Sequence, residues 1–124
     1  MPPPVPPAVL AERARPLPAP PAVVWRSLTH LQDPRTRPWL VLLPDEVRPQ
    51  VVEAVEASYV CWSSLWPSRP DDVVHLELTA RAGGTLLRFR LEASGALPDA
   101  SRTGHLRRRL NQLLFADLRF SYGQ

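Results

Sequence analysis

The sequence contains no lysine and only one cysteine, Cys61. A single cysteine cannot form an internal disulfide, and no group of cysteine and histidine residues has the spacing of a zinc site. All 15 basic residues are arginine, and the 12 acidic residues leave a formal net charge of only +3. This modest excess of positive charge gives no reason to expect a nucleic-acid partner.

Long apolar runs are also missing. The longest apolar block, Trp39 to Leu43, is too short to span a bilayer, and the chain does not open with a basic segment followed by a long apolar stretch. We therefore expect a cytoplasmic protein with no membrane partner. The sequence has no phosphate-binding glycine loop, nucleophile elbow or metal motif, so we expect no cofactor, no metal and no catalytic residue that can be named.

The longest amphipathic segment runs from Asp99 to Phe120 and predicts a helix. Its leucines recur at i, i+4, i+7, i+8 and i+12, which gathers them into one stripe: Leu106, Leu110, Leu113, Leu114 and Leu118. Asp99 or Ser101 can cap the first turn, and Gly123 suits a left-handed end.

Asp117 interrupts this stripe, because it lies four residues after Leu113 and seven after Leu110. A carboxylate on a buried face needs a partner. We expect Asp117 to be ionised and held by an arginine or by hydroxyl and indole donors. Two roles stay open for it: an ion pair that fixes the end of the helix, or contact with a ligand.

The first half of the chain is punctuated by proline. Residues 1–8 predict an extended, disordered tail, and Val9 to Leu17 a strand. A helix should begin near Pro21 and be closed by Asp33 and Pro34. The block Trp39 to Leu43 is expected to form one or two helical turns.

The second half changes to an extended pattern. Val51 to Ala57 and Tyr59 to Trp66 are rich in valine and aromatic residues, and Val74 to Arg81 and Leu87 to Glu92 alternate apolar and polar residues. Gly83 and Gly84 should make the tight turn between the last two strands. An antiparallel sheet with one apolar face must be covered, and the leucine stripe of the final helix is the expected cover.

Three stretches together resemble the SRPBCC superfamily, the helix-grip fold of START-related and birch-pollen-allergen-like domains. Pro18 to Trp25 resembles its passage from strand one into helix one, Asp72 to Gly95 its penultimate hairpin, and Leu106 to Gly123 its terminal helix. The resemblance implies an α+β domain over residues 9–124, in which a curved antiparallel sheet wraps a long C-terminal helix, with one or two short helices after strand one. Pro44 to Gln50 leaves little room for the further strands that members usually have.

The resemblance also implies a ligand cavity between sheet and helix, which would bind a small hydrophobic or aromatic molecule. Its expected walls are Trp25, Trp62, Leu76, Leu78, Leu87, Phe89, Leu91, Leu106, Leu110, Leu113, Leu114 and Asp117. Leucines at this spacing would look the same in a solid core. Two alternatives remain: an enzyme of the polyketide cyclase or dehydratase kind, and an interaction module like the heat-shock-ATPase activator homologues. Whether the chain forms a homodimer stays open.

Other polar candidates are weaker. His75 and Glu77 share one strand face, which suits acid/base work but also a solvated surface. Cys61 has no base beside it in the sequence, so we expect a small buried residue. His30 and His105 are expected at the surface. The triplet Arg107 to Arg109 either serves an anionic partner or is a solvated helix face.

Overall fold

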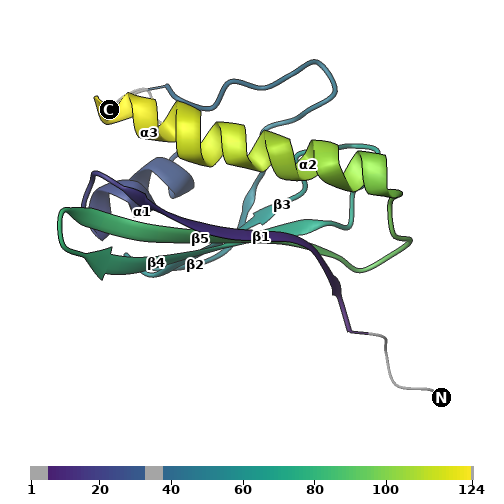
Figure 1. Cartoon of the computed structure of the whole chain (residues 1–124), viewed down its shortest axis with the longest axis horizontal. Coiled ribbons are helices and arrows are strands. Elements are labelled where there is room, and N and C mark those ends of the chain that lie inside the picture. Colours follow the sequence, from purple (N-terminus) through teal and green to yellow (C-terminus); the bar gives the residue numbers. More distant parts are fainter. Residues whose placement is uncertain (1–5, 33–37, 124) are drawn as a thin grey trace.

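In the computed structural model, which describes residues 6–32 and 38–123, one antiparallel sheet lies beneath a long C-terminal helix (Figure 1). The elements are β1 (Ala8–Leu17), α1 (Pro21–Thr29), β2 (Val51–Val55), β3 (Tyr59–Ser63), β4 (Val73–Arg81), β5 (Gly84–Ala93), α2 (Ala100–Gln112), the π-helical turn η1 (Leu113–Asp117) and α3 (Leu118–Ser121). The strand order is β1-β5-β4-β3-β2, so the first strand pairs with the last. The predicted α+β helix-grip architecture is confirmed.

The N-terminal predictions are partly confirmed. Most of the expected tail lies outside the described residues, but Ala8 already belongs to β1. The helix begins at Pro21 as expected and ends at Thr29, while Asp33 and Pro34 lie outside the described residues.

The expected helical turns at Trp39 to Leu43 are wrong, because this segment has no regular secondary structure. Its conformation is set by side-chain contacts instead. The Trp39 indole donates to the Ser27 carbonyl at 3.0 Å and stacks on Trp62, with ring centroids 6.2 Å apart.

The β4–β5 hairpin turns at Ala82 and Gly83, one residue earlier than expected, since Arg81 pairs with Gly84. Gly83 has φ +83°, which accounts for its lack of a side chain. Gly84 is needed for another reason: a Cβ atom there would lie 2.0 Å from the Leu17 carbonyl oxygen. The next residue, Thr85, donates to the Ala19 carbonyl at 2.6 Å and so ties the hairpin to the end of β1.

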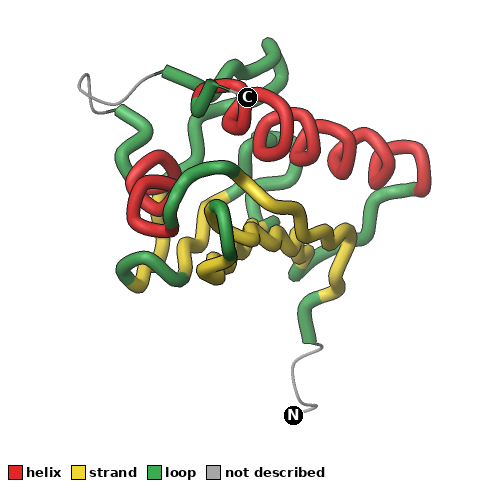
Figure 2. The backbone as a smooth tube through the Cα atoms, turned by 60° about the vertical axis from the view of Figure 1, so that its left-hand side comes forward, coloured by secondary structure: helices red, strands yellow, loops and turns green. Residues whose placement is uncertain are grey.

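The C-terminal helix has both predicted ends. The Asp99 carboxylate accepts a hydrogen bond from the Arg102 amide at 2.7 Å, and Gly123 has φ +85° just beyond the last turn. Viewed from the side, the C-terminal helix crosses one face of the sheet, and no helix of the described residues covers the other face (Figure 2).

The helix is not α-helical throughout. The Leu118 amide bonds to the Leu113 carbonyl, five residues back, in the turn η1. In a regular α-helix Leu118 would lie about 140° around the axis from Leu113. The wider turn reduces this angle, and Leu118 is completely buried, whereas Asp117 is only partly buried. Asp117 is therefore not in the middle of the apolar stripe.

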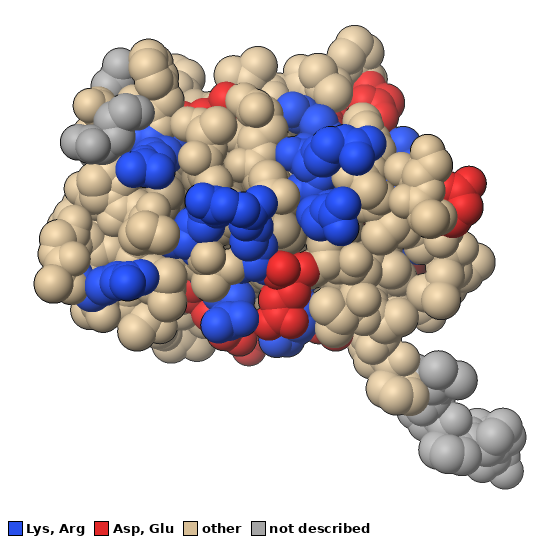
Figure 3. All heavy atoms as spheres, viewed as in Figure 1, with Lys and Arg blue, Asp and Glu red and all other residues tan. Residues whose placement is uncertain are grey.

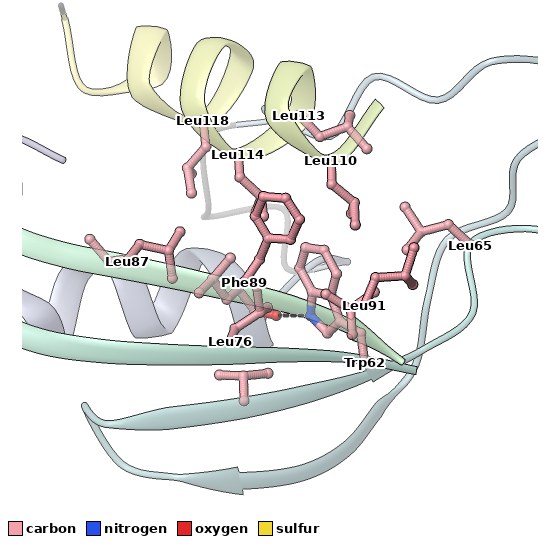
Figure 4. Packing of buried hydrophobic residues seen from close by; sticks show 14 of the residues in the cluster. Trp62, Leu65, Leu76, Leu87, Phe89, Leu91, Leu110, Leu113, Leu114 and Leu118 are labelled. Atoms are coloured by element: carbon pink, nitrogen blue, oxygen red, sulfur yellow. Dashed lines mark hydrogen bonds between the residues drawn. The ribbon is translucent and has the colours of Figure 1, made fainter. Parts of the chain in front are cut away.

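The core fills the space between helix and sheet. Leu110, Leu113, Leu114 and Leu118 point from the helix toward Leu87, Phe89 and Leu91 on β5 (Figure 4). Trp62 lies below them and donates from its indole to the Leu28 carbonyl at 2.8 Å. This hydrogen bond satisfies a buried donor and joins β3 to α1.

Candidate functional site

The residues predicted as cavity walls come together, and most of them form the core. Nine have no exposed surface: Trp62, Leu76, Leu87, Phe89, Leu91, Leu106, Leu110, Leu113 and Leu114; Leu78 is 6 % exposed. Trp25 is half-buried against this cluster, and its indole donates to the Tyr59 carbonyl at 3.2 Å. Their contact with a ligand stays a prediction.

Asp117 is the exception, because it lines an open cleft of about 220 Å³ between the end of the C-terminal helix and the segment that begins at Pro38. The other lining residues are Pro38, Trp39, Val41, Phe120 and Ser121. We expected an arginine, or hydroxyl and indole donors, to hold Asp117. Arg109 interacts with Asp117 electrostatically, and the Asp117 carboxylate accepts a hydrogen bond from the side-chain amide of Gln112 at 2.8 Å. Gln112 and Asp117 are five residues apart, which is the spacing that a π-helical turn brings together.

Two of the apolar walls are held in place by polar contacts. Trp39 is fixed by its bond to Ser27 and its stacking on Trp62, and it is only 5 % exposed. The carbonyl of Val41 accepts a hydrogen bond from Arg109 at 3.2 Å. Val41 and Phe120 remain 66 % and 71 % exposed, so the cleft combines the buried ring of Trp39 with exposed apolar side chains.

A buried ion pair, which the sequence did not reveal, anchors the segment that forms the cleft. Arg109 binds both carboxylate oxygens of Glu46 at 2.7 Å, and the Leu43 amide donates to the same carboxylate at 2.9 Å. Burial raises the pKa of Glu46, but the bonds from Arg109 and Leu43 outweigh it and hold that pKa below its usual value. Arg109 of the basic triplet is thus a structural residue.

These contacts define what the cleft can do chemically. It offers aromatic and aliphatic surface around one carboxylate, and Asp117 is the only titratable side chain among the described residues that line it. The arrangement suits an apolar or aromatic group that carries a hydrogen-bond donor or a positive charge.

A second open cleft, of about 370 Å³, lies between the end of α1 and the start of β2. Its walls come from two short segments, Thr29 to Gln32 and Arg48 to Val51. Sequence reasoning did not identify it, because neither segment has a periodic pattern.

The outer face of the sheet carries a polar network that includes His75. Its ring contacts the Tyr59 hydroxyl through Nδ1 at 2.5 Å and the Glu92 carboxylate through Nε2 at 2.6 Å. Glu77, the partner suggested by the sequence, instead lies 3.6 Å from Arg90. Both ring nitrogens are engaged, so this network links three strands.

Cys61 lies beside this network and is 5 % exposed, as expected of a small buried residue. Burial raises the pKa of its thiol and raises the pKa of the Tyr59 hydroxyl to about 12. Both groups therefore stay protonated at neutral pH, and neither is an activated nucleophile. His30 is exposed, and His105 is half-buried on the C-terminal helix.

Comparison with known proteins supports the fold. No family model matches the sequence, and no curated protein is a significant match to it. An AHSA1-like protein from Rhizobium etli is similar in structure, with TM-score 0.60 and 22% identity over 88% of this chain and 78% of that one. CalU16 from Micromonospora echinospora gives TM-score 0.63 and 16% identity over 84% of this chain and 70% of its own.

A third similar structure, the Aha1 dimer from Colwellia psychrerythraea, gives TM-score 0.62 and 15% identity over 87% of this chain and 91% of that one. These likenesses, together with the strand order and the terminal helix, show that the chain has the helix-grip fold. Within residues 6–32 and 38–123, no helix is both long and apolar enough to cross a membrane, and no group of three or more His, Cys, Asp and Glu residues is arranged to hold a metal ion.

Proposed function

We propose that this protein binds a small apolar or aromatic molecule in the cleft beside its C-terminal helix. The observation that carries the proposal is the convergence of Trp39, Val41 and Phe120 around the Asp117 carboxylate. Val41 and Phe120 are large apolar side chains left mostly exposed, and a ligand between them would cover that surface.

The cleft adjoins one of the residues that the sequence predicted as cavity walls. Trp39 forms its buried wall and stacks on Trp62, which lies in the core. A cleft of about 220 Å³ is smaller than most ligand sites, which measure about 300–1,000 Å³, so the molecule it accepts is small. A longer ligand would have to move the segment from Pro38 to Val41 away from the helix.

Binding is better supported than turnover. A cyclase or dehydratase would need a second acid or base placed opposite Asp117, and no other titratable side chain is among the described residues that line the cleft. Asp117 then serves to orient a donor group on the ligand.

A pair of matched ligands tests this function. 1-Naphthylmethylamine and 1-naphthoic acid have the same ring system and opposite charge at pH 7. We expect the amine to bind saturably, with shifts in the NMR signals of the Trp39 indole and of Phe120, and the acid to bind at least about tenfold more weakly because of Asp117.

Variants decide which role Asp117 has. Asp117→Asn should remove the preference for the amine and leave the melting temperature within a few degrees, whereas Glu56→Gln, at an exposed carboxylate in the β2–β3 turn, should change neither. If Asp117→Asn lowers stability and leaves amine binding intact, Asp117 has only a structural role. Absence of saturable binding by either compound would contradict the proposed function.

A homodimer also stays a proposal. One similar structure is a dimer. In this chain, β2 is an edge strand whose five residues are all exposed, among them Val52 at 63 % and Val55 at 53 %. An exposed apolar edge strand of this kind can pair with another copy of the chain.

A further inference from the structure

The two flanks of the C-terminal helix differ in how their arginines are neutralised. On the flank that faces the segment before β2, Arg109 is paired with Glu46 at 2.7 Å, and Arg102 lies 3.9 Å from Asp45. The opposite flank lies along β1, which α2 contacts. Among the residues that the structure describes, no acidic side chain pairs with the arginines of this second flank.

Side-chain spacing identifies the residues of this second flank. Four residues follow one another at intervals of four and therefore lie along one side of the helix: Arg107, Asn111, Phe115 and Arg119. Phe115 marks where that side points, because its ring lies 5.9 Å from the ring of Phe89 on β5. Arg107 and Arg119 are exposed on either side of Phe115.

The pairing of β1 with β5 places two more arginines beside this flank of the helix. Arg13 is opposite Phe89 and Arg15 is opposite Leu87. Residues directly opposite in an antiparallel pair project their side chains to the same face of the sheet, so both arginines lie on the helix side of β1. Both are exposed, which places them at the margin between strand and helix.

We call Arg13, Arg15, Arg107 and Arg119 the basic face. In the view of Figure 3, arginine side chains gather over the C-terminal helix and β1 and outnumber the acidic ones. Within the described part of the chain, none of the four has an ion-pair partner, whereas Arg88 nearby is paired with Glu12 at 3.1 Å.

We propose that the basic face binds an extended acidic segment of another protein, which adds to the free edge of β1. Among the described strands β1 pairs with β5 alone, so its other edge can accept the hydrogen bonds of an added strand. Side chains two residues apart on a strand are separated by about 7 Å. Alternate carboxylates of the added strand therefore match Arg13 and Arg15, with Arg107 and Arg119 above them.

A nucleic acid fits this surface less well. Single strands gain affinity when their bases stack on exposed aromatic rings. Phe115 is packed on Phe89, and Phe120, the one aromatic among the large exposed apolar side chains, lines the ligand cleft. An acidic peptide does not need aromatic rings. Arginine guanidinium groups can bind its carboxylates in a bidentate manner, and the edge of β1 can bind its backbone.

Fluorescence anisotropy with three labelled probes tests the proposal. They are a 12-residue peptide of alternating Glu and Thr, its Lys-Thr counterpart, and a 12-nucleotide single-stranded oligonucleotide. We expect the full-length protein to bind the Glu-Thr peptide at least about tenfold more tightly than either other probe at 0.15 M salt, and more weakly as salt rises. A Glu-Thr peptide methylated at alternate backbone nitrogens should lose binding, because it cannot add to a strand edge.

Two double variants locate the binding. Arg13→Ala with Arg15→Ala should weaken Glu-Thr binding about tenfold or more. Arg26→Ala with Arg48→Ala removes two exposed arginines, on α1 and before β2, that form no ion pair with any described residue. This variant should leave Glu-Thr binding unchanged, and circular dichroism should show both double variants folded. Equal loss in the two variants, tighter binding of the oligonucleotide, or full binding of the methylated peptide would each overturn the proposal.

Discussion

At the scale of single residues, Glu46 is the clearest case of a charge that the fold must neutralise. Its side chain has no exposed surface, and Arg109, the Leu43 amide and the Trp66 indole all donate to it. The pair joins α2 to the irregular segment that carries Val41 and so shapes the cleft beside Asp117. A buried ion pair of this kind adds little net stability when intact but is costly to break.

We expect Glu46→Gln to destabilise the protein by about 3 kcal/mol, because it leaves the Arg109 guanidinium nearly buried without a counter-charge. Urea unfolding followed by circular dichroism at pH 7 measures the change. Asp45→Asn is the matched control, since the Asp45 carboxylate is 52% exposed and 3.9 Å from its arginine. A loss no larger in Glu46→Gln than in this control would contradict the argument.

The same pair predicts how stability depends on pH. The folded state lowers the pKa of Glu46 from its usual value of 4.5. A carboxylate with a lowered folded pKa contributes stability above its unfolded pKa, and the contribution is lost as pH falls through the folded value. The difference in unfolding free energy between wild type and Glu46→Gln should therefore be full at pH 7 and shrink below pH 4.5.

At the scale of elements, the sequence predicted the long helix well but not its π turn. Three features of this helix depend only on residues near one another in the sequence, and all three are confirmed: the leucine spacing, the Asp99 cap and the glycine at the end. The position of the Asp117 side chain depends instead on how the helix packs against the rest of the fold. Only contact with the sheet determines that Leu118 is buried and that Asp117 is turned toward the cleft.

The same distinction accounts for the other errors. Trp39 lies in a sequence with helical character, yet its conformation depends on Ser27 and Trp62, which are 12 and 23 residues away. The partners of His75 were missed because Tyr59 and Glu92 come from neighbouring strands. The alternation of Val74 to Arg81 and of Leu87 to Glu92 predicted which face β4 and β5 bury, but cross-strand pairing decides which side chains meet.

The π turn predicts that one residue can be removed from the helix. Deleting Ala116 makes Leu118 the fourth residue after Leu113, which a regular α-helix also places on the buried face. We expect this variant to fold, with a melting temperature near that of the wild type and an altered affinity of the cleft.

Deleting Arg108, which is equally exposed, is the control. It rotates Leu110, Leu113 and Leu114 by about 100° relative to Leu106, and it should unfold the protein. Thermal melts of the two deletions compare them directly. Equal destabilisation would show that the π turn is required for folding.

At the scale of the whole molecule, the C-terminal helix separates two surfaces of different chemistry. One flank carries the cleft with Asp117, and the other carries the basic face beside β1. Because the helix and the sheet share one core, a ligand in the cleft and a partner on the basic face would bind a common rigid element.

The stability of this arrangement rests on the leucine stripe, and Leu110 lies at its centre with no exposed surface. Leu110→Asp would replace a packed side chain by an unpaired buried carboxylate, at a cost of several kcal/mol, comparable with the 5–15 kcal/mol that typically stabilises a domain. We expect this variant to lose its cooperative thermal transition and its near-ultraviolet circular dichroism. Leu97→Asp, at a leucine that is 65 % exposed, should melt like the wild type. A Leu110→Asp variant with the wild-type melting temperature would show that the helix does not pack on the sheet as the fold requires.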